Sequence, residues 1–255
     1  MNGIKKFMLR GYYKLLRNLP GTQDTLLSIQ GGPLKGLQFN LNIGTEYLLG
    51  SYELDSLELI LDKIGPNDVV YDLGANAGYY AMAMAQKTKQ KIYAFEPMPV
   101  NIERLKKHLN VNSVGNVEIK AMAISDHSGE IEFSNVASLV GNTYVQSSPH
   151  FEETSNTFKV PTNSIDNLVF GNEKLKPPNI IKIDVEGAEF DVLKGAERTI
   201  KEFRPILLLA THDVHLPGVK KDCLEFLDKM KYKVTPTDVA KSVKQLEDFI
   251  AFPEN

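Results

Sequence analysis

The sequence has no tryptophan, a single cysteine and little excess of charge of either sign. One cysteine cannot form a disulfide within the chain, which favours a reducing compartment, and we expect a cytoplasmic protein. Cys223 shares a helical apolar stripe with Phe226, Leu227 and Met230, so we interpret it as a packing residue rather than a catalytic thiol. The net charge of −3 argues against a nucleic-acid partner, because such proteins usually carry a basic field.

Long hydrophobic runs are also missing. The apolar stretches are far shorter than the ~18–20 residues that span a bilayer, so we predict no transmembrane segment. Residues 1–18 are basic, and their apolar residues recur at helical spacing without the apolar core of a signal peptide. Two interpretations stay open for this segment: a helix that docks on the rest of the protein, or weak peripheral contact with anionic lipid.

Strand and helix patterns alternate along most of the 255 residues. We expect an N-terminal extension over residues 1–50, a helix followed by a β-hairpin within 26–43, and a main domain over 51–255. Alternating units predict a Rossmann-like α/β fold, with a mostly parallel seven-stranded sheet and helices on both faces. The predicted strands are 69–73, 91–95, 117–124, 180–183, 205–210, 233–235 and 249–252, and the predicted helices are 53–64, 78–87, 99–110, 187–202 and 219–231.

An insertion at about 125–176 interrupts this alternation. Residues 130–133 and 157–160 have strand patterns, and they flank a polar segment rich in Ser, Asn, Thr and Gly. Long irregular insertions are usually functional or disordered. We expect an added hairpin that carries either a mobile loop over the site or a plain surface elaboration.

A glycine turn follows the first main strand. Its spacing is Gly74-x-x-x-Gly78 rather than the G-x-G-x-x-G of a dinucleotide site, and Asp72 stands two residues before it. A carboxylate there would repel a pyrophosphate but would suit a cation. S-adenosylmethionine carries an ammonium and a sulfonium, and its carboxylate can be held by N–H groups at a helix N-terminus.

A second acid, Glu96, ends the next strand, where a carboxylate can accept hydrogen bonds from both ribose hydroxyls. NAD sites also have a carboxylate at this position. Glu96 therefore indicates a ligand with a ribose, but it does not distinguish S-adenosylmethionine from NAD. Pro97 and Met98 would then lie near the adenine, and residues 122–126, with Ala123 and Ile124, could form its other wall.

Three further side chains are predicted at the same sheet edge. Asp184 and Glu186 follow the 180–183 strand, and His212 ends the next one. Such groups can orient a hydroxyl, accept its proton, hold the ammonium of the cofactor or bind a hard cation. The set lacks a metal-site spacing signature, so a divalent cation is conceivable but none is predicted. Glu189 fits a charge that stabilises a helix N-terminus about as well as a catalytic role. Tyr52 and Glu53 could reach the methionine end of the cofactor.

These segments resemble those of the FkbM-type methyltransferases, a family within the class I S-adenosylmethionine-dependent superfamily. The resemblance rests on 72–78, on Ala94-Phe95-Glu96-Pro97, on 123–126 and above all on 182–189. It implies methyl transfer to oxygen, on a hydroxylated small molecule, a sugar or glycan, or a secondary-metabolite scaffold. In one departure, this chain reads Leu209-Ala210-Thr211-His212 where the family commonly has a glutamate. The expected cofactor-binding residues are Asp72, Gly74, Ala75, Asn76, Gly78, Glu96, Pro97, Met98, Ala123, Ile124 and Asp184.

Other classes of function stay open at this stage. Methylation of base amino groups is disfavoured. Enzymes of that kind typically have an Asn/Asp-Pro-Pro-aromatic segment after the fourth strand, whereas in this chain Pro177-Pro178 precede that strand and acids follow it. The alternatives are an NAD-dependent oxidoreductase and a non-catalytic cofactor-binding module. Neither the acceptor nor the oligomeric state is indicated by any motif.

Overall fold

A seven-stranded sheet forms the centre of the computed structural model, which describes residues 3–22, 24–134, 157–237 and 246–254. The strand order is β11-β12-β10-β9-β3-β4-β5, and the neighbours from β10 to β5 are parallel. Strand β12 runs antiparallel to both β10 and β11. The predicted mostly parallel sheet is therefore confirmed. Its strands are β3 (Val70–Leu73), β4 (Ile92–Phe95), β5 (Val117–Lys120), β9 (Ile180–Ile183), β10 (Ile206–His212), β11 (Tyr232–Pro236) and β12 (Leu246–Pro253).

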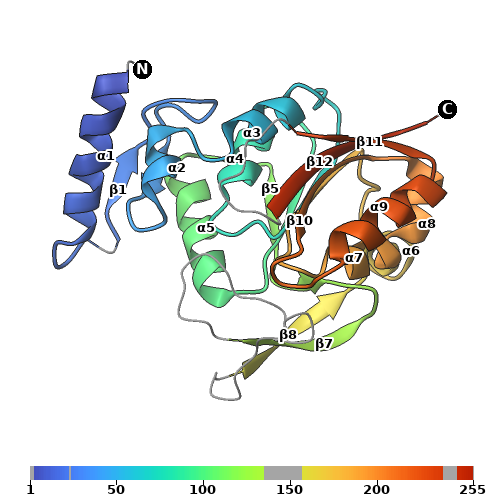
Figure 1. The fold of residues 1–255 in the computed structure, drawn as a ribbon. Helices are drawn as coiled ribbons and strands as arrows, with labels where there is room; N and C mark the ends of the chain where they lie inside the picture. Colours follow the sequence, from blue (N-terminus) through green and yellow to red (C-terminus); the bar gives the residue numbers. More distant parts are fainter. Residues whose placement is uncertain (1–2, 23, 135–156, 238–245, 255) are drawn as a thin grey trace.

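Helices cover both faces of this sheet (Figure 1). Successive strand residues point to opposite faces, so Val70 packs into one apolar core while Tyr71 and Leu73 pack into the other. The first core receives helices α3 to α5, and the second receives α6 to α9, including the fully buried Cys223. These helices are α3 (Leu54–Leu61), α4 (Tyr79–Ala85), α5 (Pro99–Val111), α6 (Ile165–Phe170), α7 (Glu189–Gly195), α8 (Glu197–Phe203) and α9 (Val219–Lys229).

The N-terminal segment forms the predicted helix and hairpin. It comprises α1 (Gly3–Arg17), β1 (Leu26–Ser28), β2 (Gln38–Asn40) and α2 (Thr45–Leu49), with β1 and β2 antiparallel. Phe39 stacks on His108 of α5, and the backbone N–H of Asn40 donates to the same imidazole. Helix α1 lies at the outer edge of the molecule (Figure 1).

Two predicted boundaries are wrong. The strand predicted over 117–124 ends at Lys120, and Ala123–Ile124 forms β6 in a separate three-stranded sheet. The helix predicted over 187–202 divides at Ala196 into α7 and α8. Asp166 explains this division, because its carboxylate accepts the backbone N–H groups of Arg198 and Thr199 and so caps a new helix start.

The insertion contributes the predicted strand pair. Strands β7 (Gly129–Ser134) and β8 (Thr157–Asn163) are antiparallel, and β8 also pairs with β6. The polar segment 135–156 lies outside the described residues. Among the residues that are described, no helix is both long enough and apolar enough to cross a membrane.

Candidate active site

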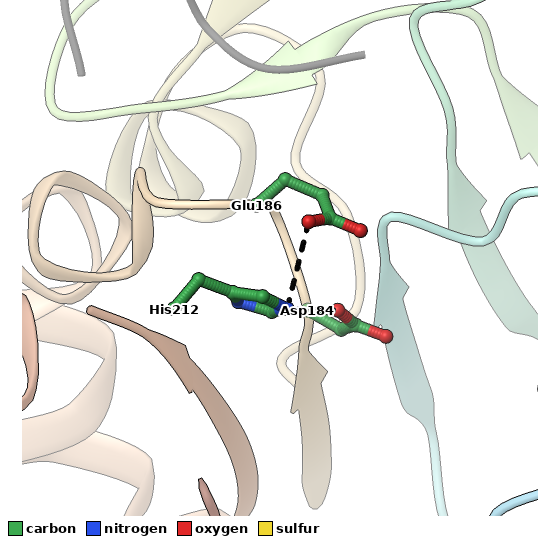
Figure 2. A group of neighbouring side chains, drawn as sticks. All are labelled: Asp184, Glu186 and His212. Carbon is green, nitrogen blue, oxygen red and sulfur yellow. Dashed lines mark ion pairs between the residues drawn. The ribbon is translucent and has the colours of Figure 1, made fainter. Parts of the chain in front are cut away.

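Asp184, Glu186 and His212 meet at the carboxyl ends of β9 and β10 (Figure 2). His212 Nε2 lies 3.6 Å from Asp184 Oδ1 and 3.6 Å from Glu186 Oε2. Since β9 and β10 are neighbouring parallel strands, their carboxyl ends lie at the same edge of the sheet. The structure thus brings together the three residues that the sequence placed at this edge.

A fourth residue, Glu189, binds the other ring nitrogen of His212. Its carboxylate is fully buried in the first turn of α7 and accepts a hydrogen bond from His212 Nδ1 at 2.7 Å. A carboxylate that only accepts fixes the proton on Nδ1 and leaves Nε2 to face Asp184 and Glu186. The backbone N–H of Gly187 donates to the same Glu189 oxygen at 2.9 Å.

The turn between β9 and α7 directs Glu186 toward this imidazole. Glu186 has φ 55° and Gly187 has φ 109°, which place both residues in the left-handed region. A non-glycine residue there is uncommon and is retained where the surroundings enforce it. Glu186 Oε2 also lies 2.9 Å from His215 Nε2, so a second histidine borders the site.

The carboxylates stabilise the protonated form of His212. Burial alone would lower the pKa of His212, but the hydrogen bond to Glu189 and the charges of Asp184, Glu189 and Glu186 outweigh it and raise the pKa to about 9. The 3.6 Å contacts of Nε2 are too long for hydrogen bonds. Nε2 therefore makes no hydrogen bond to Asp184 or Glu186.

Lys182 occupies the middle of a buried charge network. Its Nζ lies 3.4 Å from Asp72 Oδ1, 3.2 Å from Asp184 Oδ2 and 4.9 Å from the ring centroid of Tyr80. Burial would lower the pKa of Lys182, but the carboxylates of Asp184, Asp72 and Glu53 outweigh it and raise it. Asp72 is fully buried below the glycine turn, so its side chain meets Lys182 rather than the open edge of the sheet.

Glu53 lies beside this network, just before α3, in a small pocket. Burial, together with the charges of Asp184 and Asp248, raises the pKa of Glu53 to about 7. The pocket holds more carboxylates than cations, a charge that suits the ammonium and sulfonium end of S-adenosylmethionine. Its lining residues are Glu53, Tyr80, Lys182, Ile183, Asp184, Leu208, Ala210 and Asp248.

The glycine turn packs directly against the end of β9. A Cβ atom on Gly74 would lie 1.9 Å from the carbonyl oxygen of Asp184, and Gly74 has φ 76°, so only glycine fits there. The backbone N–H of Asn76 donates to Glu96 Oε2 at 2.8 Å, and that of Met98 donates to Glu96 Oε1 at 2.9 Å. Glu96, at the end of β4, is thereby fixed beside the turn.

An apolar cluster lies next to Glu96. Met98 and Ala123 pack there with Ile131, Val160 and Ala188. Pro97 is half-buried at the same strand end. The side chain of Ile124 packs into the second core instead, so at that position only the backbone can face this cluster.

A cation could also occupy the site. One ligand atom each from Asp184, Glu186 and His212 lies within 4.8 Å of the others. Metal binding would require His212 to lose its Nε2 proton, and its raised pKa opposes that at neutral pH.

Sequence reasoning missed two members of the site. Lys182 lies inside the motif of residues 182–189, but the pattern indicates no role for it. The sequence leaves Glu189 open between a helix-terminal charge and a catalytic role. A signal existed for each residue. Lys182 interrupts an otherwise apolar buried strand, and Glu189 lies one turn before the buried Val192 and Leu193 on the core side of α7.

Comparisons with known proteins identify the family of the chain. The FkbM methyltransferase domain matches residues 72–234. The hexuronic acid methyltransferase AglP of Haloferax volcanii is 30% identical over 198 residues, which cover 78% of this chain and 75% of the relative. The 2-O-methyltransferase NoeI of Sinorhizobium fredii is 28% identical over 159 residues, which cover 57% of this chain and 63% of NoeI.

A solved structure shows the same fold. The FkbM methyltransferase of Methylobacillus flagellatus superposes with a TM-score of 0.53 at 14% identity, and the match covers 98% of this chain. The chain spans 60% of the length of that protein. The family match extends over more than half of the chain, and the curated relative agrees with it. This protein therefore belongs to the FkbM methyltransferase family and is an S-adenosylmethionine-dependent methyltransferase rather than an NAD-dependent oxidoreductase.

Proposed function

We propose that this enzyme transfers a methyl group to a hydroxyl oxygen of a sugar or glycan. The observation that carries the proposal is the His212 imidazole, which is held by Glu189 and faces Asp184 and Glu186 at the strand ends. Two of the relatives support the acceptor class, since one is named for hexuronic acid and another for 2-O-methylation.

We assign the cofactor to the edge formed by β3, β4 and β9. S-adenosylmethionine supplies a methyl group on a sulfonium, which is already a good electrophile. Glu96 would hold the ribose, and Met98 and Ala123 would border the adenine. The turn from Gly74 to Gly78 would hold the carboxylate of the methionine end. The carboxylates of Glu53 and Asp184 would attract its ammonium.

The remaining task of the protein is to align the hydroxyl, exclude water and remove one proton. We assign alignment to Asp184 and Glu186, whose oxygens can accept a hydrogen bond from the hydroxyl. His212 in its neutral form is the general base: Nε2 accepts the hydroxyl proton as the oxygen acquires the methyl group. Asp72 acts indirectly, through the position of Lys182 and hence of Asp184.

A carboxylate acceptor is the competing possibility for an acidic sugar. Methylation of a carboxylate needs no base, and the acids at 184 and 186 would repel it from the reacting centre. The proposal therefore favours an ether product over an ester.

The test is transfer of a labelled methyl group to free hexuronic acids, their glycosides, neutral hexoses and amino sugars. We expect label on oxygen that survives mild alkaline hydrolysis, because ethers are stable and esters are not. Label that is released as methanol, or that lies on nitrogen, would contradict the proposal.

Variants of the site test the residue roles. Asp184→Asn, Glu186→Gln and His212→Ala should each slow turnover by about 10²–10⁴-fold, and calorimetry should show whether cofactor binding is intact. His127→Ala is the matched control, since His127 is an exposed histidine whose ion pair is with Asp126 and not with a catalytic acid. Near-normal turnover in all three site variants would refute the assignment.

A further inference from the structure

Helix α1 has an inner face that fixes it to the rest of the protein. Tyr13 is buried, and Leu9 and Leu16 pack against the first apolar core. Arg10 Nη2 lies 2.7 Å from Glu46 Oε1 of α2. These contacts fix the orientation of α1, so its opposite face points away from the rest of the protein.

The outer face of α1 is apolar and exposed. Its large side chains recur every three or four residues, which places them on one stripe of a helix. Scattered exposed apolar residues are ordinary, but a contiguous apolar stripe marks an interaction surface. The stripe consists of Ile4, Phe7, Met8, Tyr12 and Leu15, which are 73%, 77%, 68%, 54% and 64% exposed.

The charged residues of α1 are all of one sign. Helix α1 has five basic residues and no acidic one, in a chain whose net charge is −3. Viewed down the helix, Lys14 borders the stripe on one side and Lys5 on the other. Lys6 and Arg10 lie toward Glu46 of α2. An apolar stripe between basic residues is the pattern of a helix that lies in the interface of a membrane.

We propose that α1 is a docking surface for a membrane that carries anionic lipids. The apolar stripe would enter the boundary between headgroups and acyl chains, and the lysines would meet the lipid phosphates. A second copy of this chain fits the stripe less well, because it would bring its own Lys5 and Lys14 against the same two lysines. Helix α1 stands at one end of the molecule, beyond β1 and α2 (Figure 1), where a flat surface can approach it. This proposal does not depend on which acceptor the enzyme uses.

The test is co-sedimentation of the full-length protein with vesicles. Phosphatidylcholine vesicles are compared with vesicles of phosphatidylcholine mixed with phosphatidylglycerol, each at low and high salt. We expect binding to the mixed vesicles that weakens with salt, since the attraction between the lysines and the lipid is screened. The variant Phe7→Ser/Met8→Ser/Leu15→Ser should bind about tenfold less, and Lys5→Glu/Lys14→Glu should lose its binding chiefly at low salt.

Matched controls separate this surface from general effects. Val100→Ser removes an exposed apolar side chain outside α1, and Lys87→Glu reverses an exposed charge elsewhere, so both should bind vesicles as the wild type does. Circular dichroism verifies that each variant is folded. The proposal is overturned if the wild type stays in the supernatant with the mixed vesicles, or if the triple serine variant binds equally well. It is also overturned if sedimentation velocity shows a dimer in the wild type and a monomer in that variant, since the stripe would then be a protein interface.

Discussion

The Nδ1 atom of His212 donates a hydrogen bond to Glu189 Oε1 at 2.7 Å, and this bond joins the end of β10 to the first turn of α7. This bond helps to raise the pKa of His212, and the raised pKa predicts how the activity depends on pH. With a His212 pKa of about 9, kcat/KM should rise about tenfold per pH unit from pH 7 and level off near pH 9, because only the neutral imidazole can accept a proton.

Glu189→Gln should move this inflection to lower pH by about one unit, since a neutral amide stabilises the imidazolium less than a carboxylate does. A purely structural Glu189 would change the rate without moving the inflection. Glu197→Gln, on the exposed side of α8, is the control and should leave the profile unchanged.

The raised pKa of His212 also links stability to pH. The imidazolium is stabilised in the folded state, so this stabilisation is complete below the unfolded-state pKa of about 6.5 and is lost as the pH rises to about 9. The full effect is on the order of 3 kcal/mol. Urea unfolding at pH 6.5 and at pH 9.5 measures it. The wild type should lose more stability between these pH values than His212→Gln, and equal losses would disprove the linkage.

Lys182→Met should destabilise the protein strongly. Lys182 is the cation between Asp72 and Asp184, and removal of one partner of a buried ion pair costs about 3–5 kcal/mol. The control is Lys201→Met, whose partner Glu197 is exposed, where the expected cost is within about 1 kcal/mol. Denaturant unfolding at neutral pH compares the two. Similar losses in both variants would show that the Lys182 network contributes little.

Binding of S-adenosylmethionine should release protons near pH 7. Glu53 is partly protonated there because burial and the charges of Asp184 and Asp248 raise its pKa to about 7. An ammonium bound nearby would lower this pKa and expel the proton. Calorimetry in two buffers with different ionisation enthalpies measures the release. Glu53→Gln should abolish most of it, and Glu58→Gln, at an exposed position of α3, should not. Proton uptake by the wild type would contradict the assigned place of the ammonium.

Chelation should leave methyl transfer within about twofold of its starting rate, because the His212 imidazolium already supplies positive charge among the carboxylates. The measurement is turnover before and after dialysis against EDTA. A loss that Mg²⁺ or Mn²⁺ restores would instead assign Asp184, Glu186 and His212 to a metal.

Much of the fold followed from the sequence because its signals are local. Buried strands such as Ile180–Ile183 are short apolar runs, and the turn at Gly74 needs a positive φ that glycine supplies. The errors arose where a distant partner decided the outcome. The division between α7 and α8 depends on Asp166, whose carboxylate comes from α6.

The sequence by itself determined that Asp184, Glu186 and His212 share one edge, because parallel strands bring their carboxyl ends together. Only the tertiary structure decided which partner each charged side chain contacts. Asp72, expected to face the cofactor, lies buried against Lys182, and Glu189 proved to be the partner of His212. Pairing and burial depend on distances of a few ångströms between segments far apart in the chain. These distances set whether a group is charged, and no spacing along the sequence encodes them.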